Sequence, residues 1–284
     1  MKFFLFLVRI GKESAKDELF AMASQLTYKI LLAFFPFLIF LLSMLGFLNL
    51  DQKYWIDLIT GALPGEAASI LDVFIDEIAP KNVGVLSASL LVTVYSASSG
   101  FSVAMRCISQ TYGFKYCRSF IKSQLASIFL MLLFVLSLAS MLVLMIFNDL
   151  ILNLIQQHIP LGDIAKQIIH LVGFIFTVGV LLITTMLIYK TSLCKKTRFF
   201  SFLPGALVTV LSWIVSSKVF NIYVNNFAKY SKVYGSVAGI FILIMWLNLI
   251  STSLLMGSEI NSILDPLDDA AEKEKKAEAL AQSN

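Results

Sequence analysis

Charged residues, histidine and cysteine are all scarce in this sequence. Only 14% of its 284 residues are charged, against about a quarter in soluble globular domains. The two histidines, His158 and His170, have no cluster of other metal-ligand types around them, and no two of the three cysteines lie close enough for a zinc or redox motif. A phosphate-binding P-loop and a nucleophile elbow are also missing. We therefore expect no enzyme, metal site or cofactor, and no ATP-driven transport by this chain alone.

Apolar residues are correspondingly abundant, at 58% of the sequence. This excess is typical of a polytopic membrane protein, since soluble domains contain about half apolar residues. The net charge of +4 comes from 22 Lys and Arg against 18 acids. Such a small excess does not indicate a nucleic-acid partner. The apolar composition makes membrane lipids the expected partners.

Six apolar segments are long enough to cross a bilayer, which takes about 20 residues in a helix. The sequence thus predicts an all-α membrane protein with six transmembrane helices. The expected spans are Leu26–Leu50, Val83–Val103, Ser123–Phe147, Ile168–Tyr189, Phe202–Val224 and Ser236–Ile260.

Lys and Arg collect in the segments on one side of these spans. That side has Lys2, Arg9, Lys12, Lys16, Lys29, Arg106, Lys115, Arg118, Lys122, Lys190, Lys195, Lys196, Arg198, Lys273, Lys275 and Lys276. Because loops with an excess of Lys and Arg stay in the cytoplasm, this side and both termini are predicted to be cytoplasmic. Cys107, Cys117 and Cys194 fall on the same side, and we expect them to be free thiols.

The parts outside the spans have distinct patterns. Residues 1–20 are predicted to form an amphipathic helix on the membrane surface, 21–264 the transmembrane domain, and 265–284 a charged cytoplasmic tail. Apolar residues at helical spacing within 51–82 predict two short amphipathic helices in the first outer loop, and Asp149–Lys166 predicts a similar outer piece.

Several residues suggest special backbone geometry or close helix packing. Pro36 lies in the middle of the first span, where it predicts a kink. Small residues from Ser96 to Gly100 favour a close approach of helices, as does the pair Gly235 and Gly239 in a GxxxG pattern. This GxxxG pattern fits packing within one chain or between copies, so a homo-oligomer stays open.

The last span carries a stripe of polar residues, which makes it the main candidate for function. At helical spacing, one broad face takes Asn248, Ser251, Thr252, Ser258, Glu259 and Ser262. A carboxylate in or beside an apolar span is costly unless it is paired or wet. We expect Glu259 to lie near the cytoplasmic face and to pair with Arg106 or Lys29. Such a pair would be either a gate or a static clamp, and the spacing does not decide between them.

A polar cavity beside this stripe would collect small and polar side chains from two spans. The expected lining residues are Asn248, Ser251, Thr252, Ser96, Ser99 and Gly100.

Four segments resemble the YihY/virulence factor BrkB family of bacterial inner-membrane proteins. They are LTYKILLAFFPFLIFLLSMLGFL in the first span, SASSGFSVAMRCISQTYG after the second, LPGALVTVLSW at the start of the fifth, and YGSVAGIFILIMWLNLISTSLLMGSEINSIL. The last contains the family's G-x-E-[LI]-N pattern at Gly257, Glu259, Ile260 and Asn261. Lys29 departs from the small or aromatic residue that many relatives have, so a pairing of Lys29 would be particular to this chain.

The resemblance implies six transmembrane helices and an inner-membrane location. It also makes transport of a lipid or another amphiphile the leading hypothesis for function. The alternative is a membrane scaffold for envelope integrity that transports nothing. A ribonuclease label attached to the family is not matched by any residue pattern suited to RNA cleavage.

Overall fold

The computed structural model describes residues 2–47, 83–114, 118–158, 163–194, 197–227 and 236–264. Within these ranges every regular element is a helix. The elements are α1 (Lys2–Lys16), α2 (Leu19–Phe47), α5 (Val83–Thr111), α6 (Phe120–His158), α7 (Asp163–Ser192), a short 3₁₀ helix η1 (Phe199–Phe202), α8 (Leu203–Phe227) and α10 (Ser236–Leu264).

The prediction of six membrane-spanning helices in an all-α protein is confirmed. Each of α2, α5, α6, α7, α8 and α10 is long and apolar enough to cross a bilayer. Most of these helices extend beyond the predicted spans: α2 begins at Leu19 rather than Leu26, and α5 continues past Val103 to Thr111. Hydropathy marks only the apolar part of a helix, whereas its hydrogen bonds continue through polar residues that find partners inside the protein.

The expected outer piece Asp149–Lys166 is not a separate element in the described part of the chain. Residues Asp149–His158 continue α6, and α7 begins at Asp163. The reason is local, because no proline or glycine interrupts the sequence between Phe120 and His158. The helices expected within 51–82, Gly235 and the tail 265–284 lie outside the described residues.

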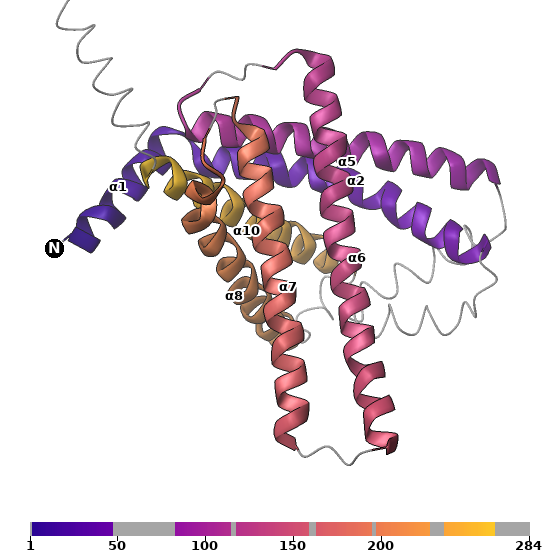
Figure 1. The fold of residues 1–284 in the computed structure, drawn as a ribbon. Coiled ribbons are helices and arrows are strands. Elements are labelled where there is room, and N and C mark those ends of the chain that lie inside the picture. The colour runs from indigo at the N-terminus through magenta and orange to yellow at the C-terminus, as the bar shows by residue number, and fades with distance from the viewer. Residues whose placement is uncertain are drawn as a thin grey trace, which may run out of the picture.

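We group the spans as three pairs, α2 with α5, α6 with α7, and α8 with α10, although α6 contacts α5 as extensively as it contacts α7. In Figure 1, α2 and α5 run side by side across the view, while α6 and α7 run down it. Helix α10 joins the pairs, since it packs on α8, α2 and α5. The pairs therefore start from a common region and leave it in different directions.

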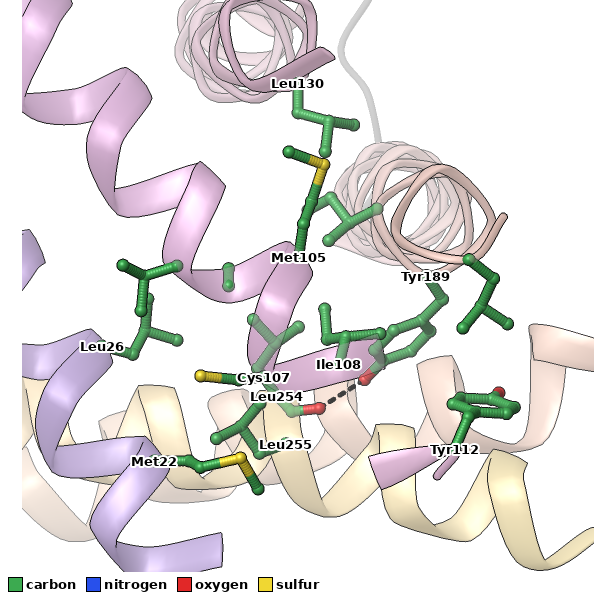
Figure 2. Close-up of a cluster of buried hydrophobic side chains, with 14 of the residues drawn as sticks. Met22, Leu26, Met105, Cys107, Ile108, Tyr112, Leu130, Tyr189, Leu254 and Leu255 are labelled. Carbon is green, nitrogen blue, oxygen red and sulfur yellow. Dashed lines mark hydrogen bonds between the residues drawn. The ribbon is translucent and has the colours of Figure 1, made fainter. Parts of the chain in front are cut away.

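We call this common region the converging end. It consists of the N-terminal halves of α2, α6 and α8 and the C-terminal halves of α5, α7 and α10. The largest fully buried side chains all lie there: Tyr189, Phe202, Leu19, Met105, Ile108, Leu130, Leu255, Glu259, Val210, Asn261, Thr185 and Thr209. Figure 2 shows part of this core, where Ile108 lies beside Tyr189, Met105 points toward Leu130, and Leu255 lies near Met22. Because successive spans alternate in direction, these six helix halves belong to one side of the membrane.

Away from the converging end, the helices keep large apolar side chains exposed. These include Val83, Leu90, Leu91 and Val92 of α5, Leu171, Val172, Phe174 and Ile175 of α7, Val219 and Ile222 of α8, and Phe241 of α10. In a membrane these surfaces contact lipid tails, which are as apolar as the side chains themselves.

Helix α1 packs against the bundle with one of its faces. Ile10 and Ser14 are buried, and the Ser14 hydroxyl lies 3.9 Å from the sulfur of Met256 on α10. The exposed face carries Arg9 and Lys12. The predicted two-sided helix is therefore present, with its less polar face turned to protein. Its position in the membrane interface stays a prediction.

Pro36 and Glu18 are two positions with special backbone properties. Helix α2 continues through Pro36, and a kink at this residue stays a prediction. Between α1 and α2, Glu18 has φ +52°. This left-handed conformation is unfavourable for residues other than glycine, asparagine and aspartate.

Candidate functional site

Polar side chains of α10 contact three other spans at the converging end. The Ser251 hydroxyl lies 3.2 Å from Thr27 on α2, and the Ser258 hydroxyl lies 2.6 Å from Thr111 on α5. All four hydroxyls are buried. The polar stripe predicted for the last span is thus a set of helix contacts, and it ties α10 to α2 and α5 as well as to α8.

The strongest group of contacts joins α7, α8 and α10, and we call it the α7–α8–α10 cluster. It consists of Tyr189, Gly205, Thr209, Gly257 and Asn261. The Tyr189 hydroxyl lies 2.7 Å from Thr209 Oγ1 and 2.7 Å from the carbonyl of Leu254. Figure 2 shows Tyr189 reaching this carbonyl from α7. One phenol therefore bridges three helices.

The hydroxyl hydrogens of this cluster are fully used. Since a carbonyl only accepts, Tyr189 donates to Leu254, and Thr209 then donates to Tyr189 or to a carbonyl. Thr209 Oγ1 lies 2.9 Å from the carbonyl of Gly205 and 3.2 Å from that of Ser253. The two hydroxyls thus have more acceptors than hydrogens to donate, so both hydrogens are always bonded, and the bond to Leu254 holds the phenol ring in place.

Asn261 caps the start of α8 from another helix. Its Oδ1 accepts a hydrogen bond from the backbone N–H of Gly205 at 2.7 Å, and its Nδ2 donates to the carbonyl of Phe202 at 3.2 Å. The first N–H groups of a helix have no partner within it. In an apolar setting such a donor is costly to leave unsatisfied. Asn261 removes that cost, and Pro204 beside it has no N–H to satisfy.

Gly205 and Gly257 mark the closest approach of α8 and α10. A Cβ built on Gly257 would lie 2.5 Å from the Gly205 carbonyl oxygen and 2.5 Å from the Tyr189 hydroxyl. A Cβ on Gly205 would overlap the Asn261 side chain. Neither position therefore has room for a methyl group. Close backbone contact is how membrane helices gain dispersion energy where hydrophobic burial offers little.

Glu259 is buried at the converging end, with 1% of its surface exposed. Arg106 is exposed, and its guanidinium donates to Ser102 Oγ on the same helix at 3.4 Å. Lys29 is half-buried. The structure thus places the three charges at the converging end, and the pairing of Glu259 with Arg106 or Lys29, like its role as gate or clamp, stays a prediction.

The expected cavity-lining residues fall into two groups. Ser251 and the half-buried Asn248 face α2, where Asn248 Nδ2 lies 3.4 Å from Thr27 Oγ1 and 3.5 Å from Ser24 Oγ. Thr252 is half-buried. These positions join helices, so a polar cavity beside them stays a prediction.

The small-residue segment of α5 lies elsewhere in the bundle. Ser96 and Ser99 are half-buried and Gly100 is buried, yet a Cβ on Gly100 would meet no atom within 4 Å. The neighbouring Ser98 accepts a hydrogen bond from Gln124 of α6 at 2.9 Å. Close packing is thus absent at Gly100 itself. Gly239 belongs to α10, so only half of the GxxxG pattern lies in a described element.

The sequence does not reveal the role of Tyr189, which is only the last residue of an expected span. Thr209 lies in the segment LPGALVTVLSW without any distinguishing feature, and Gly257 and Asn261 stand out only as parts of the family pattern. The combination of glycine, threonine and asparagine at the ends of two apolar helices is a packing signal. It does not tell which helices meet.

The cysteines differ from the expectation of three free thiols. Cys107 is a buried free thiol, but Cys194 is disulfide-bonded. The expectation for Cys194 is therefore wrong, because spacing along the chain shows only close pairs and disulfides depend on distances in the fold. Within the part of the chain that the structure describes, no three His, Cys, Asp or Glu side chains gather as a metal site would require.

Comparison with known proteins gives a consistent result. The family model described as "Virulence factor BrkB" matches residues 10–282. A "Putative ribonuclease-like protein YfkH" of Bacillus subtilis (strain 168) is 31% identical over 85% of this chain and 88% of its own length. A "UPF0761 membrane protein" of Xanthomonas oryzae pv. oryzae is 26% identical over 87% of this chain, which spans 57% of that relative.

No solved structure matches the chain. The family match covers nearly the whole sequence, including all six spans and the α7–α8–α10 cluster. The chain therefore belongs to the virulence factor BrkB family.

Proposed function

We propose that this integral membrane protein transports a lipid or another amphiphile across the membrane. The observation that carries the proposal is the contrast between the two halves of the bundle. Polar contacts close the converging end, while the helix pairs diverge beyond it and keep apolar side chains exposed (Figure 1). An amphiphile has the same division into a polar and an apolar part.

The diverging surfaces are suited to acyl chains. Leu91 of α5 and Val172 of α7 belong to different helix pairs, and both are well exposed. Lipid chains can lie on such surfaces without a loss of apolar contact, since the side chains and the chains have similar polarity. An amphiphile could thus reach the bundle sideways from the bilayer.

The converging end would act as the gate in this proposal. Hydrogen bonds between membrane helices average about 0.6 kcal/mol each. Separating α10 from its neighbours would break only a few of these contacts, such as those of Ser258 and Tyr189. These bonds would therefore add little to the cost of opening, and most of that cost would come from the close packing of α8 and α10 at Gly205 and Gly257. Glu259, buried among these contacts, would become wet when the end opens.

The test is lipid flux in vesicles that contain the purified protein. We expect Glu259→Ala and Glu259→Gln to lower the flux while the protein still folds, as judged by thermal unfolding. Glu18→Gln is the matched control, because Glu18 is an exposed acid near the same end and outside the α7–α8–α10 cluster. Flux that is unchanged in both Glu259 variants would remove this residue from the mechanism, and absence of flux in the unmodified protein would remove the proposal.

A scaffold without transport is the second candidate, and the completeness of the α7–α8–α10 cluster favours it. Gly205 and Gly257 leave no space between their helices, and Asn261 satisfies the start of α8. Such an interface would serve as a static clamp. A structure in lipid with a wide polar cavity beside α10 would contradict the scaffold.

We further propose that the protein lies in the bacterial inner membrane with the converging end in the cytoplasm. The exposed cations Arg9, Lys12, Arg106 and Lys122 belong to this end, as the positive-inside rule requires. The disulfide at Cys194, also at this end, is an observation that a reducing cytoplasm does not explain. A reporter that is active only in the cytoplasm should work when it is fused after residue 284. Activity of a periplasmic reporter at that position would reverse the orientation.

We also propose that the chain is not an enzyme, although the name of the Bacillus relative includes "ribonuclease-like". Purified protein incubated with single-stranded RNA and Mg²⁺ should leave the RNA intact. Cleavage that persists through a second purification step would contradict this.

A further inference from the structure

Arg106 occupies an unusual place for a charge, on a membrane-spanning helix and outside the packed interior. It lies in the last two turns of α5, within the candidate span Val83–Thr111, and its side chain is exposed. Its neighbours on α5, Met105 and Cys107, are buried in the core. Arg106 is therefore turned to the outside of the bundle.

The surface around Arg106 is one that contacts lipid. Arg106 reaches Ser102, and Ser102 Oγ lies 3.3 Å from Ser123 Oγ on α6, so the guanidinium lies over the seam between α5 and α6. The first turns of α6 expose Phe120 at 84% and Ile121 at 71% of their surface. Exposed apolar side chains continue along the same helix with Leu125 and Phe129. Arg106 is thus a cation at the edge of a hydrocarbon-facing surface.

The guanidinium is held, but most of its donors are not used. The buried Ser102 hydroxyl accepts a hydrogen bond from one nitrogen, Nη2, at 3.4 Å, and the buried Ser123 contacts Ser102. Arginine has five N–H donors in a planar fork, which matches the oxygens of a phosphate group. Within the described part of the chain, Arg106 has no ion pair. Because the side chain is exposed, its remaining N–H donors are open to a group outside the protein.

A second cation adjoins the seam. Lys122 precedes Ser123 on α6, is exposed, and has no ion pair among the described residues. Two exposed cations that pair with no acid of the described residues, beside an exposed apolar surface, fit a phosphate headgroup with its acyl chains on α6. We propose that Arg106 and Lys122 form a binding site for the headgroup phosphate of an anionic membrane lipid, at the α5–α6 seam of the converging end. This site does not depend on transport, because a stably bound lipid would occupy it in a scaffold as well.

The test is native mass spectrometry of the full-length protein, stripped of lipid in detergent and titrated with phosphatidylglycerol. Each basic residue near a membrane surface contributes about 1 kcal/mol of attraction to anionic lipid, which is roughly fivefold in affinity. We expect Arg106→Gln to weaken phosphatidylglycerol binding about fivefold, and Arg106→Gln with Lys122→Gln more strongly. Arg106→Lys should restore part of the binding, since it keeps the charge without the fork.

The control variant is Lys218→Gln. Lys218 is an exposed cation of α8, away from the α5–α6 seam. It should bind phosphatidylglycerol as the unmodified protein does. Equal losses in Lys218→Gln and Arg106→Gln would show general charge attraction and overturn the site, as would unchanged binding in the double variant.

Inorganic phosphate distinguishes a lipid from a free anion. Phosphate at millimolar concentration should not displace the bound lipid, because it lacks the contacts with α6. Complete displacement would show a free-phosphate site and contradict the lipid assignment. Circular dichroism and thermal unfolding of each variant confirm that a loss of binding is not a loss of fold.

Discussion

At the scale of single residues, Gly257 is the position where the least change should have the greatest effect. An added methyl group would overlap the Gly205 carbonyl and the Tyr189 hydroxyl. Overpacking of this kind costs about 1–3 kcal/mol. Gly257→Ala should therefore lower the thermal unfolding midpoint in detergent by several degrees, and it should lower flux if the cluster is a gate.

Gly100 provides a matched control for this prediction. It is also a buried glycine in a membrane-spanning helix, but a Cβ there would meet no atom within 4 Å. Alanine forms helices better than glycine by about 1 kcal/mol in water. Gly100→Ala should thus leave the unfolding midpoint unchanged or raise it. A loss equal to that of Gly257→Ala would contradict the assignment of the close contact to α8 and α10.

Glu18 offers a prediction of the opposite sign. Its φ of +52° lies in the left-handed region, where a side chain costs about 1 kcal/mol or more. Glu18→Gly should remove this strain of about 1–2 kcal/mol and lose about 0.5–1 kcal/mol through the greater freedom of glycine in the unfolded chain, so a small net stabilisation is expected in thermal unfolding. Ala21→Gly in the exposed first turn of α2 should instead destabilise it. If both variants lose stability equally, the left-handed conformation is wrong.

At the scale of elements, the start of α8 depends on a residue of α10. Asn261→Ala would leave the Gly205 N–H and the Phe202 carbonyl without their partner. An unsatisfied buried donor costs about 1–3 kcal/mol. We expect faster hydrogen exchange in peptides that cover 199–206, together with a lower unfolding midpoint.

Asn248 is the control on the same helix. Its amide makes only two long contacts, at 3.4 and 3.5 Å, with Thr27 and Ser24. Asn248→Ala should have a much smaller effect on stability and none on exchange in 199–206. Equal exchange in Asn261→Ala and the unmodified protein would contradict the capping role.

The elements themselves were largely predictable from the sequence. Each span is an apolar run whose length is fixed by the bilayer, so its existence follows from composition alone. The polar face of α10 followed from helical spacing. The partners of that face did not, because Ser258 meets Thr111 and Ser251 meets Thr27 only through the arrangement of whole helices. The partners of Glu259 stay a prediction for the same reason, although the structure shows that Arg106 shares its end of the bundle and is exposed.

At the scale of the whole molecule, sequence patterns could not predict which helices pack against each other. Every span is apolar on most of its surface, so hydropathy does not distinguish a face toward lipid from a face toward protein. Leu130 is fully buried while Leu132 and Leu136 on the same helix are exposed. All three residues are leucine, so only the packing of the helices determines which of them is buried.

The divergence of the helix pairs gives the last prediction, which concerns motion of the whole bundle. Nitroxide labels on unnatural amino acids, which leave the native cysteines intact, can be placed on α5 and α7 at either end. One pair, at Leu90 and Val172, lies on exposed sites of the diverging halves, and the other, at Gln110 and Lys190, lies on exposed sites of the converging end.

Double electron–electron resonance in lipid nanodiscs should give a short, narrow distance distribution for the converging pair and a longer, broader one for the diverging pair. The physical reason is that buried contacts of Met105, Ile108 and Tyr189 hold the converging halves together, whereas lipid replaces protein contacts beyond them (Figure 1). Addition of a transported amphiphile should change the distance distribution of the diverging pair before that of the converging pair. If the diverging pair is as close and as narrow as the converging pair, the outer halves form a packed bundle, and the scaffold then becomes the better account of this protein.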